Sequence, residues 1–105
     1  MFGFLKGLFG SKGPDVKELK EEGAIFLDVR TAEEYRKGHV KGAMNIPLDI
    51  LDSQLKKLKS KNKAIVVYCQ SGKRAKTAQS MLESAGVETV VNGGNWQRLS
   101  IKLSN

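Results

Sequence analysis

Cysteine occurs only once in the 105 residues of this chain. A single cysteine excludes an internal disulfide, and a lone thiol is best kept reduced, which favours a cytoplasmic location. Histidine also occurs only once. The Cys and His ligands of a tetrahedral structural zinc site are therefore too few, and we expect no metal site.

Long apolar runs are missing as well. The most apolar stretch, MFGFLKGLFGSKGP at the start, is interrupted by glycines and is far shorter than the ~20 residues of a membrane-spanning helix. It also lacks the cleavage pattern of a secretory signal. The apolar side chains of residues 2–9 would still allow peripheral contact with a membrane or docking on a partner. We expect an apolar, glycine-rich segment over residues 1–12 and one domain over residues 13–105, because the chain is too short for two cores.

Acidic residues are fewer than basic ones. Eighteen Lys and Arg against 11 Asp and Glu give a net charge of +7, which favours encounters with anions. Many lysines lie in KKLKSKNK, residues 56–63, where no aromatic residue is interleaved for stacking on bases. We interpret this stretch as a solvated helix end and loop, and expect no nucleic-acid partner.

Helix signals alternate with strand signals along the chain. Asp15 is a suitable N-cap for a short helix, and the apolar run that begins at Ala24 predicts a buried strand. Thr31 and Glu34 form a capping box for the next helix, which Gly38 ends.

The second half continues this alternation. Leucines at helical spacing over residues 48–58 predict one amphipathic helix whose stripe is core. Residues 63–69, KAIVVYC, form the strongest strand pattern, and a helix with small and apolar residues on its buried side ends near residue 86. VETVV, residues 87–91, predicts the last strand, and the glycines at 93–94 predict a turn.

This pattern predicts an open α/β sheet of four to five strands, mainly parallel, with helices on both faces. Ligands of such sheets bind at the carboxyl ends of the strands. Cys69 ends the strand that we expect to be central, and Asp28 ends an earlier strand. No convincing first strand precedes Asp15, and any helix after Trp96 must be brief.

A lone cysteine is usually a buried small hydrophobe, but the surroundings of Cys69 favour a reactive and accessible thiol. The strand runs into Cys69, Gly72 allows the backbone to curl, and a helix begins at about residues 73–75. Unpaired backbone N–H groups of the helix start should point into the loop and, with Lys73 and Arg74, favour a thiolate. Such a thiolate is a nucleophile or a carrier of anionic sulfur.

Three motifs resemble those of single-domain rhodaneses, the thiosulfate sulfurtransferases. The first is Cys69-x-x-Gly72-x-Arg74, which is similar to their active-site loop. The others are LDVRTAEEYRKGHVKGAMNIP, residues 27–47, and NGGNW, residues 92–96. The resemblance covers about residues 15–96. It implies a rhodanese-like fold and a sulfur relay without a cofactor, in which Cys69 takes sulfur from thiosulfate or another sulfane-sulfur donor, and passes it to cyanide or a thiol, a protein thiol included.

The resemblance also assigns the residues of the loop. Cys69 is the expected catalytic residue, and Gln70, Ser71, Gly72, Lys73 and Arg74 are the expected substrate-binding residues. Gln70 and Ser71 fill variable positions of the motif and would contribute backbone N–H donors. Lys73 or Arg74 would bind the sulfonate end of thiosulfate, although Arg74 would equally well brace the loop through a carboxylate such as Asp28.

Outside the loop the expected roles are supporting ones. Asp28 and Arg30 would orient the mouth of the site. His39 lies in a glycine-rich turn and is not expected to act as a base, and Trp96 is expected in the core or at the lip of the pocket.

Two alternatives stay open. Phosphatases and arsenate reductases also use a loop cysteine, but their loops place five residues between Cys and Arg, where residues 70–73 supply four. The other alternative is a slow or non-enzymatic sulfur-carrier or regulatory module that acts with a protein partner.

Overall fold

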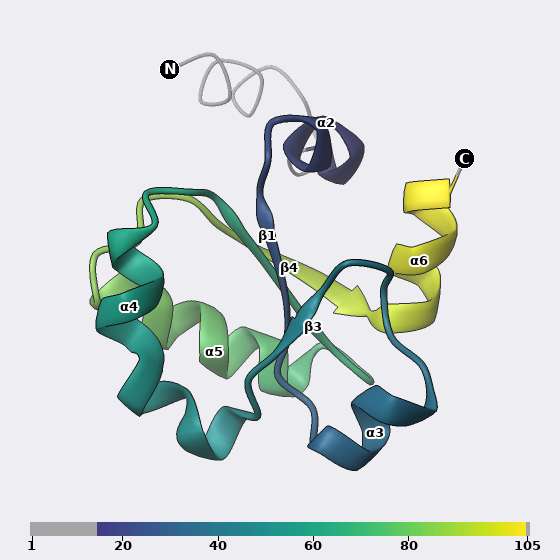
Figure 1. The fold of residues 1–105 in the computed structure, drawn as a ribbon, viewed down its shortest axis with the longest axis horizontal. Coiled ribbons are helices and arrows are strands. Elements are labelled where there is room, and N and C mark those ends of the chain that lie inside the picture. Colours follow the sequence, from purple (N-terminus) through teal and green to yellow (C-terminus); the bar gives the residue numbers. More distant parts are fainter. Residues whose placement is uncertain (1–14, 105) are drawn as a thin grey trace.

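A parallel sheet of four strands forms the centre of the molecule (Figure 1). The structure is a computed structural model, and it describes residues 15–104. The strands lie in the order β2-β1-β3-β4 and pair in parallel throughout. Their bounds are β1 (Ile25–Asp28), β2 (Met44–Asn45), β3 (Ile65–Cys69) and β4 (Val90–Asn95). The predicted open parallel sheet is confirmed.

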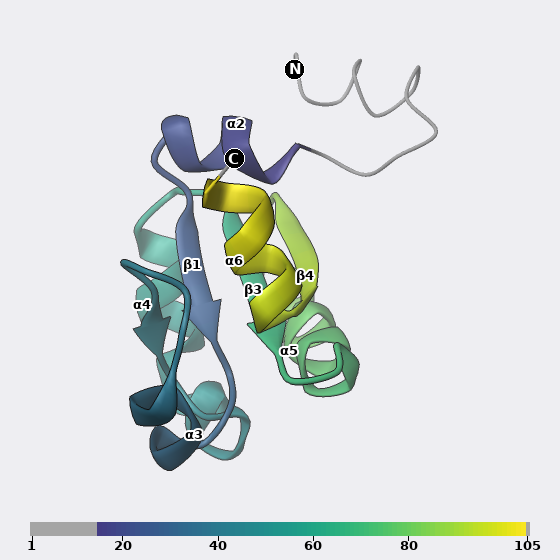
Figure 2. The same ribbon diagram turned by 90° about the vertical axis from the view of Figure 1, so that its right-hand side faces the viewer.

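Helices cover both faces of this sheet, as predicted. Helices α4 and α5 pack on one face, while α2 and α6 lie against each other on the other (Figure 2). The helical elements are α2 (Val16–Glu21), α3 (Ala32–Lys37), the 3-10 helix η1 (Leu48–Gln54), α4 (Leu55–Ser60), α5 (Lys73–Ser84) and α6 (Trp96–Ser104). The brief final helix expected after the last strand is α6.

The two predicted capping signals are present. The Asp15 side chain accepts a hydrogen bond from the N–H of Lys17 at 2.9 Å and begins α2. At α3, the Thr31 hydroxyl accepts from the Glu34 N–H while the Glu34 carboxylate accepts from the Thr31 N–H, which makes a complete capping box. These local bonds satisfy N–H groups that no helical carbonyl reaches.

Strand β3 divides its side chains between two apolar cores. Ile65, Val67 and Cys69 belong to the cluster on the α5 face, and Val66 and Tyr68 belong to the cluster on the α6 face. All five are fully buried. Because successive side chains of a strand point to opposite faces, a buried central strand must be apolar at every position.

The leucine stripe is core, but the helix that carries it is divided. Residues 48–54 form the 3-10 helix η1, and α4 begins only at Leu55. Aspartate and serine weaken the first half as an α-helix, and the Ser53 hydroxyl donates to the carbonyl of Ile50 at 2.8 Å. Leu51 and Leu58 remain buried on the same face.

The prediction for the last strand was partly wrong. Strand β4 spans residues 90–95 rather than 87–91, so Gly93 and Gly94 lie inside it and not in a turn. The register shifts opposite Val67 and Tyr68, as at a β-bulge. A Cβ on Gly93 would lie 2.9 Å from the Leu99 side chain, so this glycine permits the close approach of α6.

Residues 1–14 and 105 lie outside the described part of the chain. The expected segment 1–12, the membrane contact of residues 2–9 and the question of a strand before Asp15 all fall there. Within residues 15–104, no helix is both long enough and apolar enough to cross a membrane.

Candidate active site

Cys69 is the last residue of β3, at the carboxyl edge of the sheet. The chain then turns through Gly72, whose φ of +96° lies in the left-handed region, and α5 begins at Lys73. Two backbone N–H groups point back at the sulfur: Gly72 donates to Sγ at 2.9 Å and Ala75 at 3.4 Å. The predicted cradle of backbone donors around the thiol is therefore present in outline.

The thiol itself is not accessible in this conformation, contrary to the sequence-based expectation. Cys69 has an exposed fraction of 0%. The alternation along β3 turns its side chain toward α5, where it packs with Ala75 in the larger apolar cluster under the loop. Sγ is therefore covered in this conformation, and a solute reaches it only after the surrounding residues rearrange.

Lys73 and Arg74, the two expected binders of the sulfonate, differ in their surroundings. Lys73 is exposed and forms no ion pair within the described residues. Arg74 forms a two-bond ion pair with Glu34, Nη1 to Oε1 at 2.8 Å and Nη2 to Oε2 at 3.0 Å. Arg74 thus braces the loop against α3, and its partner is Glu34 rather than the suggested Asp28.

Glu34 has a second role that the sequence pattern did not reveal. It was identified only as part of a capping box, yet it joins α3 to the start of α5 by accepting from Arg74. The hydrogen bonds from Arg74, followed by those from Thr31, lower the pKa of Glu34 to about 2. Glu34 itself raises the pKa of Arg74. The pair therefore stays ionised at neutral pH.

Asp28 and Arg30 form a buried ion pair beside the loop. The Arg30 side chain donates from Nη2 to Asp28 Oδ2 at 2.6 Å and from Nε to Oδ1 at 3.0 Å. Nη2 also donates to the carbonyl of Gly38, so the pair ties the end of β1 to the turn after α3. Burial lowers the pKa of Arg30, but the bonds and charge of Asp28 more than offset this and leave the pKa raised.

Trp96 lies at the lip of a hollow next to the loop, one of the two positions expected for it. The Arg30 guanidinium carbon lies 5.0 Å from the centre of the indole ring. A hollow of about 230 Å³ lies here, lined by Arg30, Glu34, Lys37, Gly38, Gln70, Trp96 and Gln97. Gln70, the residue after the cysteine, connects this hollow to the loop.

Two asparagines support the loop from β4, and sequence reasoning did not identify them. Asn95 donates from its side chain to the carbonyl of Gln70 at 2.7 Å, and Asn92 donates to the carbonyl of Gly72 at 3.2 Å. The only signal was their position around the double glycine. These bonds fix the carbonyls of Gln70 and Gly72, and so support the loop in the conformation in which the Gly72 N–H donates to Sγ.

His39 makes its contacts with Tyr35 rather than with the cysteine loop. Its ring stacks on Tyr35 at a centroid distance of 3.7 Å, and its Nδ1 lies 2.7 Å from the carbonyl of Tyr35. Tyr68, on β3, accepts a hydrogen bond from the Val40 N–H at 3.0 Å, and burial raises the pKa of its phenol. These aromatic residues support the turn after α3.

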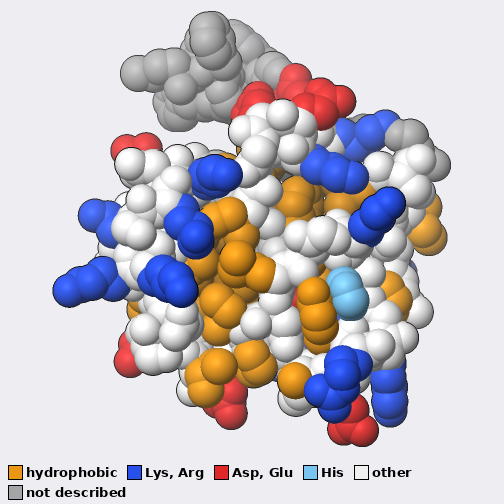
Figure 3. Space-filling view, viewed as in Figure 1, with side chains coloured by type: hydrophobic (Ala, Val, Ile, Leu, Met, Phe, Trp, Pro, Cys, Tyr) orange, Lys and Arg blue, Asp and Glu red, His pale blue; other side chains and the backbone are white. Residues whose placement is uncertain are grey.

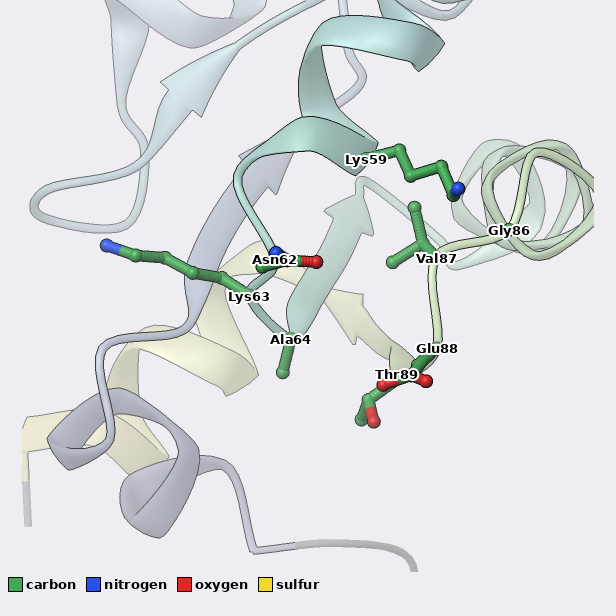
Figure 4. Close-up of a pocket in the computed structure, with 8 residues that line it drawn as sticks. All are labelled: Lys59, Asn62, Lys63, Ala64, Gly86, Val87, Glu88 and Thr89. Carbon is green, nitrogen blue, oxygen red and sulfur yellow. The ribbon is translucent and has the colours of Figure 1, made fainter.

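A second hollow, of about 390 Å³, lies at the opposite end of the sheet. Its lining comes from the loops that precede β3 and β4 (Figure 4). Lys59 extends toward Gly86 and covers the end of α5, whereas Lys63 points away from the hollow. Two helices end here, so Lys59, in the last turn of α4 and beside the end of α5, complements the negative ends of the helix dipoles. We assign no chemistry to this end.

A third hollow, of about 400 Å³, lies beside α4 and α5, and its lining holds no cysteine, histidine or basic side chain. On the face shown in Figure 3, Lys and Arg side chains lie in separate groups toward the left and right sides of the molecule, with hydrophobic side chains exposed between them. Within residues 15–104, no group of three or more His, Cys, Asp or Glu side chains is placed to hold a metal ion. The cysteine loop is therefore the site on which function is argued.

Fold and site together define an α/β domain built around a cysteine loop at the carboxyl edge of a parallel sheet. Comparison with known families agrees: the sequence model of the rhodanese-like domain family matches residues 14–97. The chain belongs to this family, as its three motifs predicted.

Individual relatives differ in name and in length. Thiosulfate sulfurtransferase PspE of Escherichia coli is 32% identical over 77 residues, a match that covers 72% of this chain and 74% of PspE. The tRNA uridine(34) hydroxylase of Escherichia fergusonii is 37% identical over 83 residues, but the match covers 72% of this chain and only 24% of the hydroxylase. This chain thus matches about a quarter of the length of that relative.

A solved structure described as "rhodanese with anions from E. coli" shares the fold. It superposes with a TM-score of 0.65 at 33% sequence identity, and the match covers 71% of this chain and 89% of that one.

Proposed function

We propose that this protein is a sulfurtransferase that carries sulfane sulfur as a persulfide on Cys69. The observation that carries the proposal is the pair of N–H groups, from Gly72 and Ala75, that donate to Sγ at the carboxyl end of β3. N–H donors fixed by the fold stabilise negative charge on sulfur without rearranging. The same donors serve a thiolate before the reaction and an anionic persulfide after it.

The first half-reaction uses thiosulfate as the donor. The thiolate of Cys69 attacks the outer sulfur of thiosulfate, the sulfur–sulfur bond of thiosulfate breaks, and sulfite leaves with the bonding electron pair. One sulfur atom remains on Sγ as a persulfide. Lys73, exposed at the start of α5, attracts the sulfonate end as it approaches.

The second half-reaction discharges the persulfide. Cyanide or a thiolate attacks the outer sulfur, the bond to Sγ breaks, and the electron pair returns to Cys69 as a thiolate. Both halves require the loop to open, because Sγ is covered in the resting conformation. The chemistry needs no resident cofactor, and it suits a reducing compartment such as the cytoplasm.

The names of the relatives support this proposal without deciding its substrate. PspE is named a thiosulfate sulfurtransferase, and the E. coli rhodanese structure is described as holding anions. The hydroxylase relative has a different name and is much longer. A relay role, in which this domain passes sulfur between proteins with little turnover on thiosulfate, is therefore the second candidate. The burial of the thiol favours the relay role, because binding of a protein partner would stabilise the open conformation of the loop.

Steady-state production of thiocyanate from thiosulfate and cyanide tests the enzymatic proposal. The wild-type protein should give saturable turnover, and Cys69→Ser should reduce the rate to that of the protein-free mixture, because a hydroxyl is too weakly acidic to act in place of the thiolate. Circular dichroism of the variant controls for folding. Slow thiosulfate turnover combined with fast sulfur transfer to a protein thiol would favour the relay, and activity on an aryl phosphate would favour a phosphatase instead.

A further inference from the structure

The hollow beside the cysteine loop is bounded by four separate parts of the chain. Arg30 follows β1, Lys37 ends α3, Gln70 belongs to the loop and Trp96 begins α6. At about 230 Å³ it is smaller than the roughly 300–1,000 Å³ of sites for drug-sized ligands. A molecule with a few heavy atoms fits such a space, whereas a folded partner does not.

Arg30 supplies a buried hydrogen-bond donor to this hollow. Its side chain is only 3% exposed, and its Nε and Nη2 are bonded to Asp28 and to the carbonyl of Gly38. Nη1 has no acceptor among residues 15–104. Every side-chain nitrogen or oxygen that is buried in this part of the chain has a hydrogen-bond partner, so Nη1 is not one of the buried atoms. Nη1 therefore keeps contact with solvent, and the hollow is the space that Arg30 lines.

The remaining charges favour an anion. The Glu34 carboxylate is paired with Arg74, with 2.8 Å between Oε1 and Nη1, and the Asp28 carboxylate is paired with Arg30. Lys37 is only loosely engaged, since its ammonium lies 3.9 Å from Glu33 and both side chains are more than 70% exposed. Such an exposed pair contributes little, so the ammonium of Lys37 is available to a ligand.

The third feature of the hollow is an apolar wall. The Trp96 ring is packed against Gly38, where an added Cβ would lie 2.7 Å from the indole, and it is stacked under Arg30. A fixed aromatic face suits the carbon chain of a ligand. Wall, donor and cation together fit a short aliphatic molecule that ends in a carboxylate.

We propose that this hollow binds the sulfur acceptor, and that the acceptor is a small thiol that carries a carboxylate. The proposal rests on the function proposed above. The acceptor's carboxylate lies between Arg30 Nη1 and Lys37, its carbon chain lies on Trp96, and its thiolate lies at Gln70, a loop residue that lines the hollow. Because Sγ is covered and faces α5, the thiolate meets the persulfide once the loop has opened. The thiolate attacks the outer sulfur of the Cys69 persulfide, the bond to Sγ breaks, Cys69 leaves as a thiolate, and the acceptor departs as a persulfide. No oxidant or reductant is consumed.

The kinetic test compares acceptors of different charge. Protein loaded with thiosulfate and freed of excess donor is mixed with 3-mercaptopropionate, with the neutral 3-mercapto-1-propanol or with cationic 2-mercaptoethylamine, and the loss of the persulfide mass is followed. At equal thiolate concentration the carboxylate should react about threefold to fivefold faster than the alcohol, the gain expected of one favourable charge contact. High salt and Lys37→Gln should remove this advantage.

The matched control is Lys41→Gln, which removes an exposed lysine that does not line the hollow. It should leave the preference intact. Equal rates for the three thiols, or equal loss of preference in the two variants, would overturn the proposal while the sulfurtransferase function stands.

A binding test is independent of persulfide formation. Trp96 is the only tryptophan of the chain, so its fluorescence reports on the hollow. Titration of the unloaded protein with 3-(methylthio)propionate, which cannot accept sulfur, should give a saturable change that 3-(methylthio)propanol does not give and that Lys37→Gln weakens. Failure of Cys69 to gain sulfur from thiosulfate or from a protein persulfide donor would contradict the proposed function, whereas an unsaturable or charge-independent titration would contradict the acceptor site.

Discussion

At the scale of single residues, the structure gives different surroundings to Lys73 and Arg74, two basic side chains that are adjacent in the sequence. Arg74 is held by Glu34 through two hydrogen bonds, so its charge is already used in positioning the loop. Lys73 is exposed and unpaired among the described residues, so its charge is free to act on an incoming anion. The motif alone did not decide between these roles, because a guanidinium suits a sulfonate and a carboxylate equally well.

The first prediction at this scale concerns Lys73→Ala. The variant should raise the KM for thiosulfate about threefold and leave kcat nearly unchanged, because an exposed cation gives steering and ground-state binding rather than transition-state stabilisation. Steady-state kinetics at low and high salt measure both parameters. Lys76→Ala, which removes an exposed lysine one turn further along α5, is the control. A large fall in kcat with an unchanged KM would show instead that Lys73 acts in the transition state.

At the scale of elements, the ion pair between Glu34 and Arg74 connects α3 to α5 across the loop. Its two side chains are about one third exposed, 34% and 36%, so solvent screens part of the attraction. The geometry with two parallel hydrogen bonds still fixes the orientation of Arg74, and Glu34 also caps α3. The loop around Cys69 is thereby tied to an element far from it in the sequence.

We predict that Glu34→Gln lowers the free energy of unfolding by about 1 kcal/mol at pH 7, the sum of a weakened cap and a screened ion pair. The pKa of Glu34 is depressed from 4.5 to about 2 in the folded protein. The stabilisation by the carboxylate is therefore complete above pH 4.5, and is lost as the pH falls from 4.5 toward 2. Urea unfolding of both proteins at pH 7 and pH 3 measures this.

The control for this prediction is Glu33→Gln, because Glu33 is 73% exposed and only 3.9 Å from Lys37. It should change the stability little at either pH. An unchanged difference between wild type and Glu34→Gln at pH 7 and pH 3 would show that the charge of Glu34 does not contribute.

The same elements show what the sequence could and could not predict. The apolar run into Cys69 and the capping box at Thr31 are local signals, and both predictions were confirmed. The close approach of α6 at Gly93 and the salt bridge from Glu34 depend on residues far apart in the chain, so no local pattern revealed them. The burial of Cys69 also depends on how the loop folds over the strand, which composition and spacing do not report.

At the scale of the whole molecule, the parallel sheet brings the ends of β1, β3 and β4 to one edge. That edge holds the cysteine loop, the buried Asp28–Arg30 pair and the hollow at Trp96. Strand ends of a parallel sheet meet in this way by topology, which is why segments that are far apart in the sequence converge on one site. The opposite edge, with its lysine-lined hollow, carries none of these groups.

The central claim is that this edge turns Cys69 into a carrier of sulfane sulfur, and intact-protein mass spectrometry after incubation with thiosulfate tests it most directly. The account predicts a gain of one sulfur atom, located on Cys69 by peptide mapping, lost again on addition of cyanide and absent from Cys69→Ser. The half-reaction should proceed without an acceptor, because sulfite is a good leaving group and the N–H groups of Gly72 and Ala75 stabilise the anion that remains. A gain only from a protein persulfide donor would replace thiosulfate turnover with the relay. No gain from either donor would contradict the account.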